Sequence, residues 1–508
     1  MLTIDGGPVH IEDLVKVARH REGVMVGPSV HATMAASRAA VERLDAEGVV
    51  AYGVTTGFGA LADRAIEPAD RVALQRAVVV SHAAGMGERL DDEVVRGMLL
   101  LRARTLAAGY SGAGAALVDG LAALLQAGVV PWVPEHGSLG ASGDLAPLAH
   151  AGSVLIGEGW AVGDAGERVP ASDALASHGL APVAIGPKEG LALINGTDAT
   201  AATLALAVHD IEALLRAADC ACAMSVEALN ATTRAFDEAV IALRPSPGQA
   251  ASAANLRALL RESPLVAAHR VSHHAVQDAY SLRCAPQVHG AARDVVGFCR
   301  ITVERELASV VDNPVILDME VVSAGNFHAQ ALAYAADLLA SVCADVAAIS
   351  ERRVDRLLDP ARSRGLPAFL SPDPGLNSGL MIAQYTAAAL VAALRAAATP
   401  LAVQSASTSA GQEDHVSMSF EAAQRTRRSV TQLRAVLAVE LLCVAQALEL
   451  RAPLRPAPAT QRLLGALRRL CPPLGADRVL AGDLAAVDGW LRDEGWAVAL
   501  AGVVEPLR

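Results

Sequence analysis

Residues 198–230 read DATAATLALAVHDIEALLRAADCACAMSVEALN, an apolar run with helical spacing that exceeds the average length of a globular helix. Similar Ala/Leu/Val runs cover residues 290–310, 328–358, 378–398 and 420–450. Helices that are apolar on nearly every side need neighbours on several sides. We therefore predict a mainly α fold with a long central helical bundle, buried partly by self-association.

The composition favours the same fold class. The 508-residue chain is 53% hydrophobic but only 3% aromatic, so Ala, Leu and Val must fill a large core. Such a core suits closely packed helices better than a sheet sandwich, which needs more aromatic and β-branched residues. We expect a mixed helix and loop region in residues 1–195, the long helices in 196–450 and short helices in 451–508, all within one compact unit.

Two local elements can be predicted near the N-terminus. The pattern of residues 2–9 predicts a hairpin that turns at Asp5-Gly6. Ser29 is a suitable N-cap for a helix that ends before Gly48.

Charge and apolar patterning exclude several classes of partner. The net charge of −12 argues against a nucleic-acid surface and against docking on anionic membranes. Charged residues such as Asp210, Asp337 and Glu440 interrupt the apolar runs, so we expect no transmembrane helix. The N-terminus shows no signal peptide, and the seven cysteines have no paired spacing, which favours reduced thiols in a cytoplasmic protein.

The sequence leaves few options for a bound cofactor. Lys16 and Lys188 are the only lysines, and neither lies in a context that could cradle the phosphate of pyridoxal phosphate (PLP). No GxGxxG or Walker motif is present to bind a nucleotide, and the acids and histidine of residues 412–418 match no common metal spacing. We therefore expect no PLP, nucleotide or metal, and any amine chemistry must rely on another kind of group.

Residues 137–148 read GSLGASGDLAPL and enclose three small residues, Ala141, Ser142 and Gly143, between further glycines. Small side chains allow a tight bend in which the Gly143 nitrogen reaches the Ala141 carbonyl carbon. Ring closure and loss of water, including the Ser142 hydroxyl, would give an electron-poor methylidene-imidazolone (MIO). The string resembles the aromatic amino acid ammonia-lyases, which make this prosthetic group from their own chain. A plain serine in a glycine-rich loop is the alternative.

Two further motifs carry this resemblance. Tyr52 is followed by three glycines in residues 52–59, YGVTTGFG, so it lies on a loop that could close over a substrate. The motif resembles the family's inner loop, whose tyrosine removes the β-proton. His82 follows Ser81 at the family's selectivity position, where Ser-His is typical of the histidine-specific members. Without the resemblance, Tyr52 and His82 could both be structural residues.

Polar residues in two later segments match the family as well. Residues 188–197, KEGLALINGT, resemble the motif whose asparagine, here Asn195, binds the prosthetic group and the substrate, although Asn-Gly is also a common turn. Gln277, Tyr280 and Arg283 are spaced for one face of a helix. In the family, the arginine holds the substrate carboxylate, the tyrosine serves the leaving amine and the glutamine orients the substrate; a solvated polar stripe is the alternative.

Three more residues complete the expected site. Phe327 resembles the aromatic residue that the family places near the prosthetic group, although it could be a core phenylalanine. Gln412 and Glu413 match the histidine-specific motif closely, with Glu413 as the partner of the substrate imidazole. Asp198 stands where many histidine-specific members have glutamine, so the hydrogen bonding next to Asn195 stays open.

The resemblance runs from about Tyr52 to Met418 and implies an aspartase/fumarase-like helical homotetramer whose active sites draw on more than one subunit. It implies non-oxidative deamination of L-histidine to trans-urocanate and ammonia, the first step of histidine degradation. Tyr52, or else Glu413, would remove the β-proton, and a buried glutamate would reject a phenyl ring by about 10⁴–10⁵. Tyrosine or phenylalanine ammonia-lyase, an MIO-dependent aminomutase and a non-catalytic helical scaffold are the alternatives. A serine hydrolase is disfavoured, because Ser142 lies outside a GxSxG motif.

Overall fold

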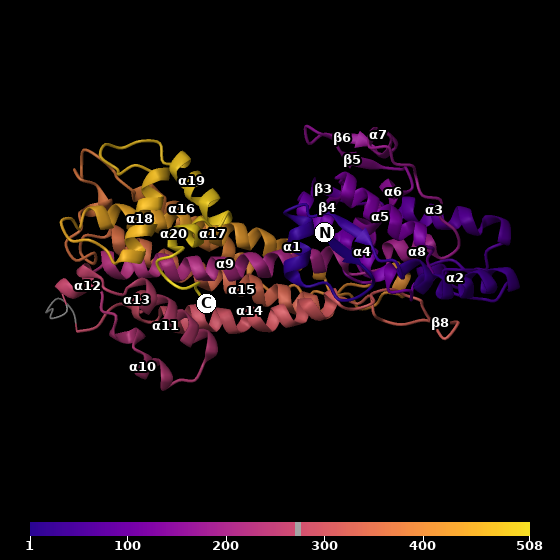
Figure 1. Ribbon diagram of the computed structural model, residues 1–508, viewed down its shortest axis with the longest axis horizontal. Coiled ribbons are helices and arrows are strands. Elements are labelled where there is room, and N and C mark those ends of the chain that lie inside the picture. The colour runs from indigo at the N-terminus through magenta and orange to yellow at the C-terminus, as the bar shows by residue number, and fades with distance from the viewer. Residues whose placement is uncertain (270–275) are drawn as a thin grey trace. The chain divides into compact units, whose positions relative to one another are not determined.

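The computed structural model describes residues 1–269 and 276–508. It is mainly helical, as predicted, and each of the five apolar runs forms a helix (Figure 1). These helices are α9 (Asp198–Ala228), α14 (Ala285–Leu307), α15 (Gln330–Leu358), α16 (Met381–Ala397) and α17 (Ser419–Glu449). The periodicity of the apolar residues was therefore sufficient to predict both the fold class and these elements.

The chain forms two compact units that alternate along the sequence. Unit 1 comprises residues 1–207, 300–337 and 400–425, and unit 2 comprises residues 208–299, 338–399 and 426–508. Each unit collects several stretches because α9, α14, α15 and α17 all continue from one unit into the other. The division into residues 1–195, 196–450 and 451–508 stays a prediction.

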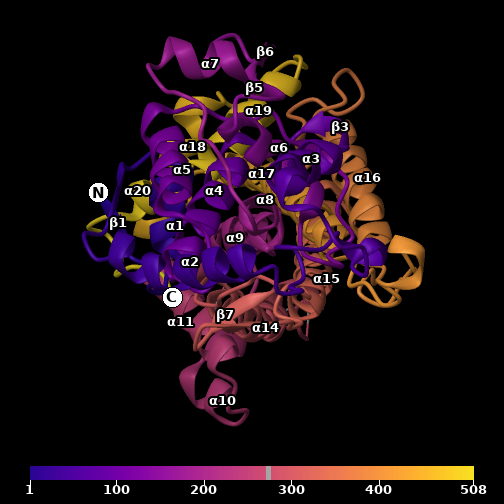
Figure 2. The same ribbon diagram turned by 90° about the vertical axis from the view of Figure 1, so that its right-hand side faces the viewer.

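Unit 1 is built around α4 (Asp92–Ala107), in which every side chain from Val94 to Ala107 is buried. It packs against α1 (Ile11–Ala18) and α5 (Ala115–Ala127), and Figure 2 shows these three helices close together. Burial along the whole of α4 provides a rigid centre for the unit.

A second group of helices in unit 1 carries the predicted motifs. α3 (Arg71–His82) packs against α6 (Leu145–Leu155) and α8 (Glu189–Ile194). His82 ends α3, the Ala141-Ser142-Gly143 bend precedes α6, and Asn195 follows α8. Three of the predicted site motifs therefore lie at the ends of helices that contact one another.

The remaining elements of unit 1 are short apart from α2 (Val30–Glu47). This helix confirms the prediction after Ser29: it ends at Glu47, before Gly48, which has a left-handed φ of +65°. The Ser29 side chain makes no capping hydrogen bond. The other elements are α7 (Ala171–Ser177) and three antiparallel pairs, β3 (Met86–Arg89) with β4 (Pro134–His136), β5 (Trp160–Val162) with β6 (Arg168–Pro170), and β7 (Val315–Leu317) with β8 (Glu320–Val322).

The hairpin predicted in residues 2–9 is wrong. β1 (Leu2–Ile4) instead pairs in parallel with β2 (Val24–Val26), and α1 forms the crossover between them. Gly6 has a φ of +83°, and a Cβ at this position would lie 2.7 Å from backbone atoms of Ala108. The Asp5-Gly6 pair therefore allows a close approach between two segments rather than a two-residue hairpin turn.

Unit 2 contains the rest of the long helices and several short ones. The short helices are α10 (Glu238–Ala242), α11 (Pro247–Leu259), α12 (Pro264–Ala268), α13 (Tyr280–Arg283), α18 (Pro458–Leu470), α19 (Ala481–Arg492) and α20 (Gly495–Leu500). Glu440 is fully buried in this unit, where it accepts hydrogen bonds from Arg353 Nη2 (2.8 Å), Ser350 Oγ (2.6 Å) and Ser225 Oγ (2.7 Å). The charge in this apolar helix is thus paired and hydrogen-bonded inside the core.

Among the described residues, three segments are long and apolar enough to cross a membrane by length and composition: Glu189–Ala228, Gln330–Leu358 and Ser419–Glu449. Interrupting charges therefore do not disqualify these runs by themselves, contrary to the expectation from the sequence. In these three segments, 100%, 61% and 78% of the most apolar 18-residue stretch is buried inside the protein. Burial in the core therefore explains why these helices are so apolar.

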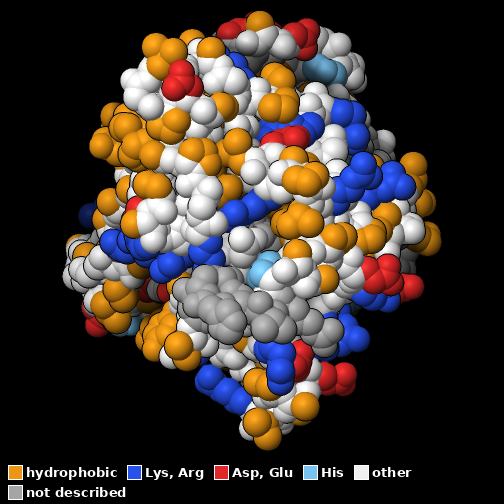
Figure 3. Space-filling model, turned by 90° about the vertical axis from the view of Figure 1, so that its left-hand side faces the viewer, with side chains coloured by type: hydrophobic (Ala, Val, Ile, Leu, Met, Phe, Trp, Pro, Cys, Tyr) orange, Lys and Arg blue, Asp and Glu red, His pale blue; other side chains and the backbone are white. Residues whose placement is uncertain are grey.

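The structure also shows how charged side chains are placed on one face and whether the cysteines are paired. Figure 3 faces the side on which α10, α12 and α18 lie, and basic side chains are interspersed there with hydrophobic ones. All seven cysteines are free, as predicted, and all except Cys284 are buried.

Candidate active site

Unit 1 contains a pocket of about 970 Å³ that collects most of the predicted site residues. The predicted residues that line it are Tyr52, His82, Ala141, Ser142, Asn195, Phe327, Gln412 and Glu413. They are distant in sequence, and they meet because residues 300–337 and 400–425 fold onto the N-terminal part of the unit. A concave site with polar groups from several segments is the usual form of a small-molecule site.

The Ala141-Ser142-Gly143 bend is pressed against a neighbouring backbone. Gly143 has a φ of +77°, and a Cβ at this position would lie 2.3 Å from the Gly196 carbonyl oxygen. The N–H of the next residue, Asp144, donates a hydrogen bond to the same Gly196 carbonyl oxygen over 2.6 Å. The bend therefore requires glycine at position 143.

Asp144 anchors this bend from the interior. Its carboxylate is fully buried and accepts hydrogen bonds from Ser138 Oγ (3.0 Å), Thr200 Oγ1 (2.9 Å) and the Thr200 N–H (2.8 Å). Burial nevertheless raises the Asp144 pKa to about 6, because the loss of water outweighs these donors.

Tyr52 lies half-buried at the pocket wall. Its hydroxyl oxygen accepts a hydrogen bond from the Gly59 N–H at 3.0 Å, and its ring meets that of Phe58 edge-on with centroids 6.3 Å apart. Burial raises the Tyr52 pKa; the Gly59 N–H opposes this effect, and the charge of Glu413 adds to it. Tyr52 is therefore a neutral phenol near pH 7, with one backbone donor already on its oxygen.

His82 presents an imidazole to the same pocket. Burial lowers the His82 pKa, and smaller effects of the Val78 carbonyl and of Glu413 oppose this change. Ser81 Oγ lies 3.1 Å from His82 Nδ1. The ring is therefore neutral near pH 7, so it can hydrogen-bond a polar group without carrying a charge.

Glu413 is held between a threonine and the bend. Glu413 Oε2 accepts a hydrogen bond from Thr408 Oγ1 at 2.7 Å, and Oε1 accepts one from Ser142 Oγ at 3.1 Å. The charge of Glu413 acts on both Tyr52 and His82, as their pKa changes indicate. One carboxylate oxygen of Glu413 is thus held by Thr408, and the other faces Ser142 in the bend.

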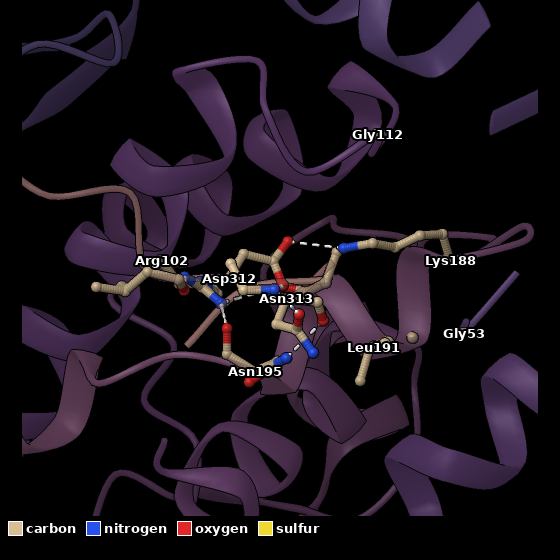
Figure 4. Close-up of polar contacts among 12 residues, drawn as sticks. Gly53, Arg102, Gly112, Lys188, Leu191, Asn195, Asp312 and Asn313 are labelled. Carbon is tan, nitrogen blue, oxygen red and sulfur yellow. Dashed lines mark hydrogen bonds and ion pairs between the residues drawn. The ribbon is translucent and has the colours of Figure 1, made fainter. Parts of the chain in front are cut away.

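Asn195 is 3% exposed, and only one end of its carboxamide makes a hydrogen bond among the described residues. Its Nδ2 donates to the Asn313 carbonyl over 2.6 Å (Figure 4), whereas the buried Oδ1 has no hydrogen-bond partner within the described residues. A buried polar atom without a partner costs about 1–3 kcal/mol, so Oδ1 marks a place where a bound group can donate. Asp198 is ion-paired with Arg102 at 3.3 Å and does not line the pocket.

Gln277, Tyr280 and Arg283 belong to unit 2 and do not line the pocket of unit 1. The helix expected to carry all three begins only at Tyr280 (α13), so the prediction of a shared helical face is wrong. Ala279 has extended dihedral angles (φ −62°, ψ 153°), so Gln277 lies outside the helix. Arg283 Nε donates to the Asp278 carbonyl over 2.9 Å. Tyr280 is 71% exposed, with the Arg283 guanidinium 4.7 Å from its ring centroid.

The pocket also has polar residues that were assigned no role in the chemistry from the sequence. They include Arg64, Asn313 and His328, together with Asp414 and His415 from the cluster of acids and histidine that matched no metal spacing. The rings of His328 and His415 stack with centroids 5.8 Å apart, and no group of three or more metal-binding side chains occurs in the part of the chain that the structure describes. The only sequence signal for Asn313 was its proximity to Phe327, whereas His415 belonged to the cluster of acids and histidine in residues 412–418.

Comparison with known proteins identifies the family. The sequence profile of the aromatic amino acid lyases matches residues 9–469. The chain belongs to this family. It is 48% identical over 501 residues to a protein named histidine ammonia-lyase from Streptomyces avermitilis, and the alignment covers 98% of each chain.

Solved structures of the family share the fold over nearly the whole chain. Tyrosine aminomutase from Streptomyces globisporus has a TM-score of 0.94 and 35% identity, with complete coverage of both chains. Histidine ammonia-lyase from Trypanosoma cruzi has a TM-score of 0.91 and 36% identity, covering 99% of this chain and 96% of that one. The expected mainly α architecture of the lyase family is confirmed.

The family is the MIO-dependent class of lyases, and the residues at the bend fit such a group. The backbone at Gly143 lies so close to Gly196 that a side chain is excluded, which leaves the nitrogen unobstructed by a Cβ. The buried Asn195 Oδ1, which has no partner among the residues that the structure describes, offers an acceptor in the same pocket. Both observations are compatible with a prosthetic group formed from the backbone of residues 141–143.

Proposed function

We propose that this chain is a histidine ammonia-lyase, which converts L-histidine to trans-urocanate and ammonia in the first step of histidine degradation. The observation that carries the proposal is the placement of the Glu413 carboxylate, held by Thr408 with its second oxygen toward residue 142. An imidazole N–H can donate to that oxygen, whereas a phenyl ring would leave Glu413 Oε1 without a donor from the substrate. Relatives that are 48% identical and named histidine ammonia-lyase support the same substrate.

We also propose that Ala141, Ser142 and Gly143 form the MIO. The Gly143 nitrogen bonds to the Ala141 carbonyl carbon; one water leaves with that carbonyl oxygen and the amide hydrogens of Gly143 and Ser142. A second water leaves with Ser142 Oγ and its hydrogen together with the Ser142 Cα hydrogen. When present, the MIO supplies an electrophile that makes the substrate amine a better leaving group.

Tyr52 is the proposed base for the β-proton, with Glu413 as the alternative. The Gly59 N–H on the Tyr52 oxygen favours the phenolate form, in opposition to burial. Asn195 offers Oδ1 as an acceptor, and His82, Phe327 and Gln412, which line the same pocket, are proposed to surround the imidazole ring of the substrate. These assignments use only groups that line the pocket of unit 1.

Arg283, Tyr280 and Gln277 are proposed to complete the site from a second copy of the chain in a homotetramer. Exposure of Tyr280 and its contact with Arg283 are compatible with a role at a surface between copies. Arg64 lines the pocket itself and is the alternative holder of the substrate carboxylate. The KM for histidine in Arg283→Met and Arg64→Met variants decides between them. We propose a cytoplasmic enzyme without nucleic-acid or membrane partners.

The test is to incubate the purified protein with L-histidine and follow urocanate by its ultraviolet absorbance, with tyrosine and phenylalanine in parallel. Urocanate from histidine, together with an intact mass two waters below that of the encoded chain, supports the proposal. Cinnamate or coumarate instead of urocanate would assign a tyrosine or phenylalanine lyase. An encoded mass without activity would favour a non-catalytic scaffold.

The fold of tyrosine aminomutase from Streptomyces globisporus, at a TM-score of 0.94, makes an aminomutase the second candidate. Such an enzyme would return the amine to Cβ, so the product would be a β-amino acid without release of ammonia. Chromatography of the reaction mixture separates β-amino acids from urocanate directly.

A further inference from the structure

A fully buried ion pair lies beside the site. Lys188 Nζ is 2.8 Å from Asp312 Oδ2, and both side chains are 0% exposed (Figure 4). Neither residue lines the pocket, and removal of both charges from water carries a desolvation penalty that well-packed apolar residues would avoid. Burial lowers the Lys188 pKa, and the charge and hydrogen bond of Asp312 oppose that change.

The choice of lysine at this position is unusual for this chain. Its only other lysine is Lys16, on the surface, whereas arginine occupies other fully buried cationic positions such as Arg96 and Arg353. An ammonium is a compact charge, while a guanidinium is a planar fork that needs several acceptors. Position 188 therefore suits a single strong contact to one carboxylate oxygen.

Lys188 and Asn195 stand at the two ends of the short helix α8, and a series of hydrogen bonds joins them again outside it. Lys188 donates to Asp312 Oδ2 at 2.8 Å, and Asp312 Oδ1 accepts from the Asn313 N–H at 2.7 Å. The Asn313 carbonyl then accepts from Asn195 Nδ2 at 2.6 Å. Together with α8, these hydrogen bonds form a closed ring that includes the carboxamide of Asn195, a residue that lines the pocket.

Neighbouring contacts fix the backbone on both sides of this ring. Arg102 Nη1 donates to the Asn195 carbonyl at 2.8 Å, and its Nη2 donates to the Val311 carbonyl at 3.1 Å. Asn313 Oδ1 accepts from the Ala324 N–H at 2.8 Å. With the backbones held, the remaining freedom is the orientation of the Asn195 carboxamide.

We propose that Lys188 and Asp312 are positioning residues, which hold Asn313 so that its carbonyl binds Asn195 Nδ2 and leaves Oδ1 to a group bound in the pocket. The two ends of an asparagine amide have similar size, but a carbonyl oxygen can accept only from the NH₂ end. Fixing that carbonyl therefore fixes which end of Asn195 faces the reacting groups. The inference rests on the proposed function in so far as Asn195 contacts the substrate or the prosthetic group.

The test is a double-mutant cycle between the ion pair and Asn195. Lys188→Met with Asp312→Leu removes both charges, which avoids an uncompensated buried charge; Asp312→Asn alone preserves the shape of the side chain. We expect either variant to lower kcat by about 100-fold with little change in KM, since a displacement of about 1 Å has an effect of this order. In an Asn195→Ala background the same changes should lower kcat by less than about threefold, because the group they position is gone.

Two further measurements separate positioning from a general structural role. Arg96→Met is the matched control: Arg96 is also fully buried, but its hydrogen bonds go to the carbonyls of Val17 and Leu125, away from the pocket. It should lower the melting temperature and leave kcat unchanged. A crystal structure of the Lys188→Met/Asp312→Leu variant should show Asn195 Nδ2 beyond hydrogen-bonding range (~3.5 Å) of Asn313 O.

The proposal is overturned if kcat falls equally in the wild-type and Asn195→Ala backgrounds, or if it does not fall at all. An unchanged Asn195 contact in the variant crystal structure overturns it as well. The intact mass of every variant shows whether dehydration of residues 141–143 is complete, so a defect in maturation is recognised separately. If the wild type deaminates tyrosine or phenylalanine instead of histidine, the proposed substrate is wrong, and the same cycle is measured with the amino acid that reacts.

Discussion

The Thr408 hydroxyl donates a hydrogen bond to Glu413 Oε2 over 2.7 Å, and the Thr408 N–H donates to the Glu413 carbonyl over 2.9 Å. The side chain and the backbone of Thr408 thus both fix the position of Glu413. Glu413 Oε1 lies 3.1 Å from Ser142 Oγ, the hydroxyl that MIO formation would remove. Loss of that hydroxyl would leave Oε1 to the imidazole of a bound histidine.

We expect Thr408→Val to lower kcat/KM for histidine by about 10-fold or more, because a hydrogen bond to a charged group contributes about 1.5–3 kcal/mol. Thr408→Ser keeps the hydroxyl and should retain most of the activity. Steady-state rates of urocanate formation measure both effects. Equal rates for the valine and serine variants would show that Thr408 does not orient Glu413.

Glu413→Gln should lower histidine turnover by about 100-fold or more, since the neutral amide is a weaker acceptor for an imidazole N–H. The dehydrated mass should be unchanged, because the residues that form the MIO are intact. Kinetics and intact mass on the same sample test both statements. Turnover close to that of the wild type would remove Glu413 from the mechanism.

Much of the fold followed from apolar periodicity, because long helices that bury most of their surface impose it on the sequence. The helices α9, α14, α15, α16 and α17 were all anticipated on this ground. The parallel pairing of β1 with β2 was not, since the turn residues Asp5 and Gly6 read as a local hairpin. Their actual role depends on the distant backbone of Ala108, which no local pattern reveals.

Among the residues predicted for the site, His82 and Asn195 stand at helix ends and line one pocket, and their roles stay predictions. The prediction failed for the helix through Gln277 and Tyr280, because spacing alone cannot show that the chain is extended at Ala279. Thr408 had no motif of its own, and its contact with Glu413 became visible only in three dimensions.

The rate should rise with pH if the Tyr52 phenolate is the base. Burial raises the Tyr52 pKa, so its ionised form is scarce near neutrality and increases about tenfold per pH unit. His82, whose pKa is lowered by burial, is already neutral over this range and does not contribute. We expect kcat/KM for histidine to increase toward alkaline pH, and Tyr52→Phe to lose this dependence along with most activity. A pH profile of the same shape in Tyr52→Phe would assign the base elsewhere, with Glu413 next in line.

Asp144 should make the protein less stable as pH rises from about 4 to 6. Its pKa is about 6 in the folded protein and near 3.8 when exposed, so the folded state binds the proton more strongly. The stabilisation is complete below the unfolded pKa and is lost as pH rises through the folded one, a difference of about 3 kcal/mol. The melting temperatures of the wild type and of Asp144→Asn are measured between pH 4 and pH 8. The difference between the two pH profiles gives the contribution of Asp144 protonation to stability. Parallel curves would mean that Asp144 does not titrate as its burial implies.

Gly143→Ala should prevent formation of the prosthetic group. An added Cβ would lie 2.3 Å from the Gly196 carbonyl oxygen, and the φ of +77° is itself unfavourable for alanine, so the bend must move. The matched control is Gly179→Ala, which has a similar φ of +68° but no atom within 4 Å of the added Cβ. We expect the full encoded mass and no turnover for Gly143→Ala, against a dehydrated and active Gly179→Ala variant. A dehydrated Gly143→Ala protein would show that the close approach to Gly196 is not needed for cyclisation.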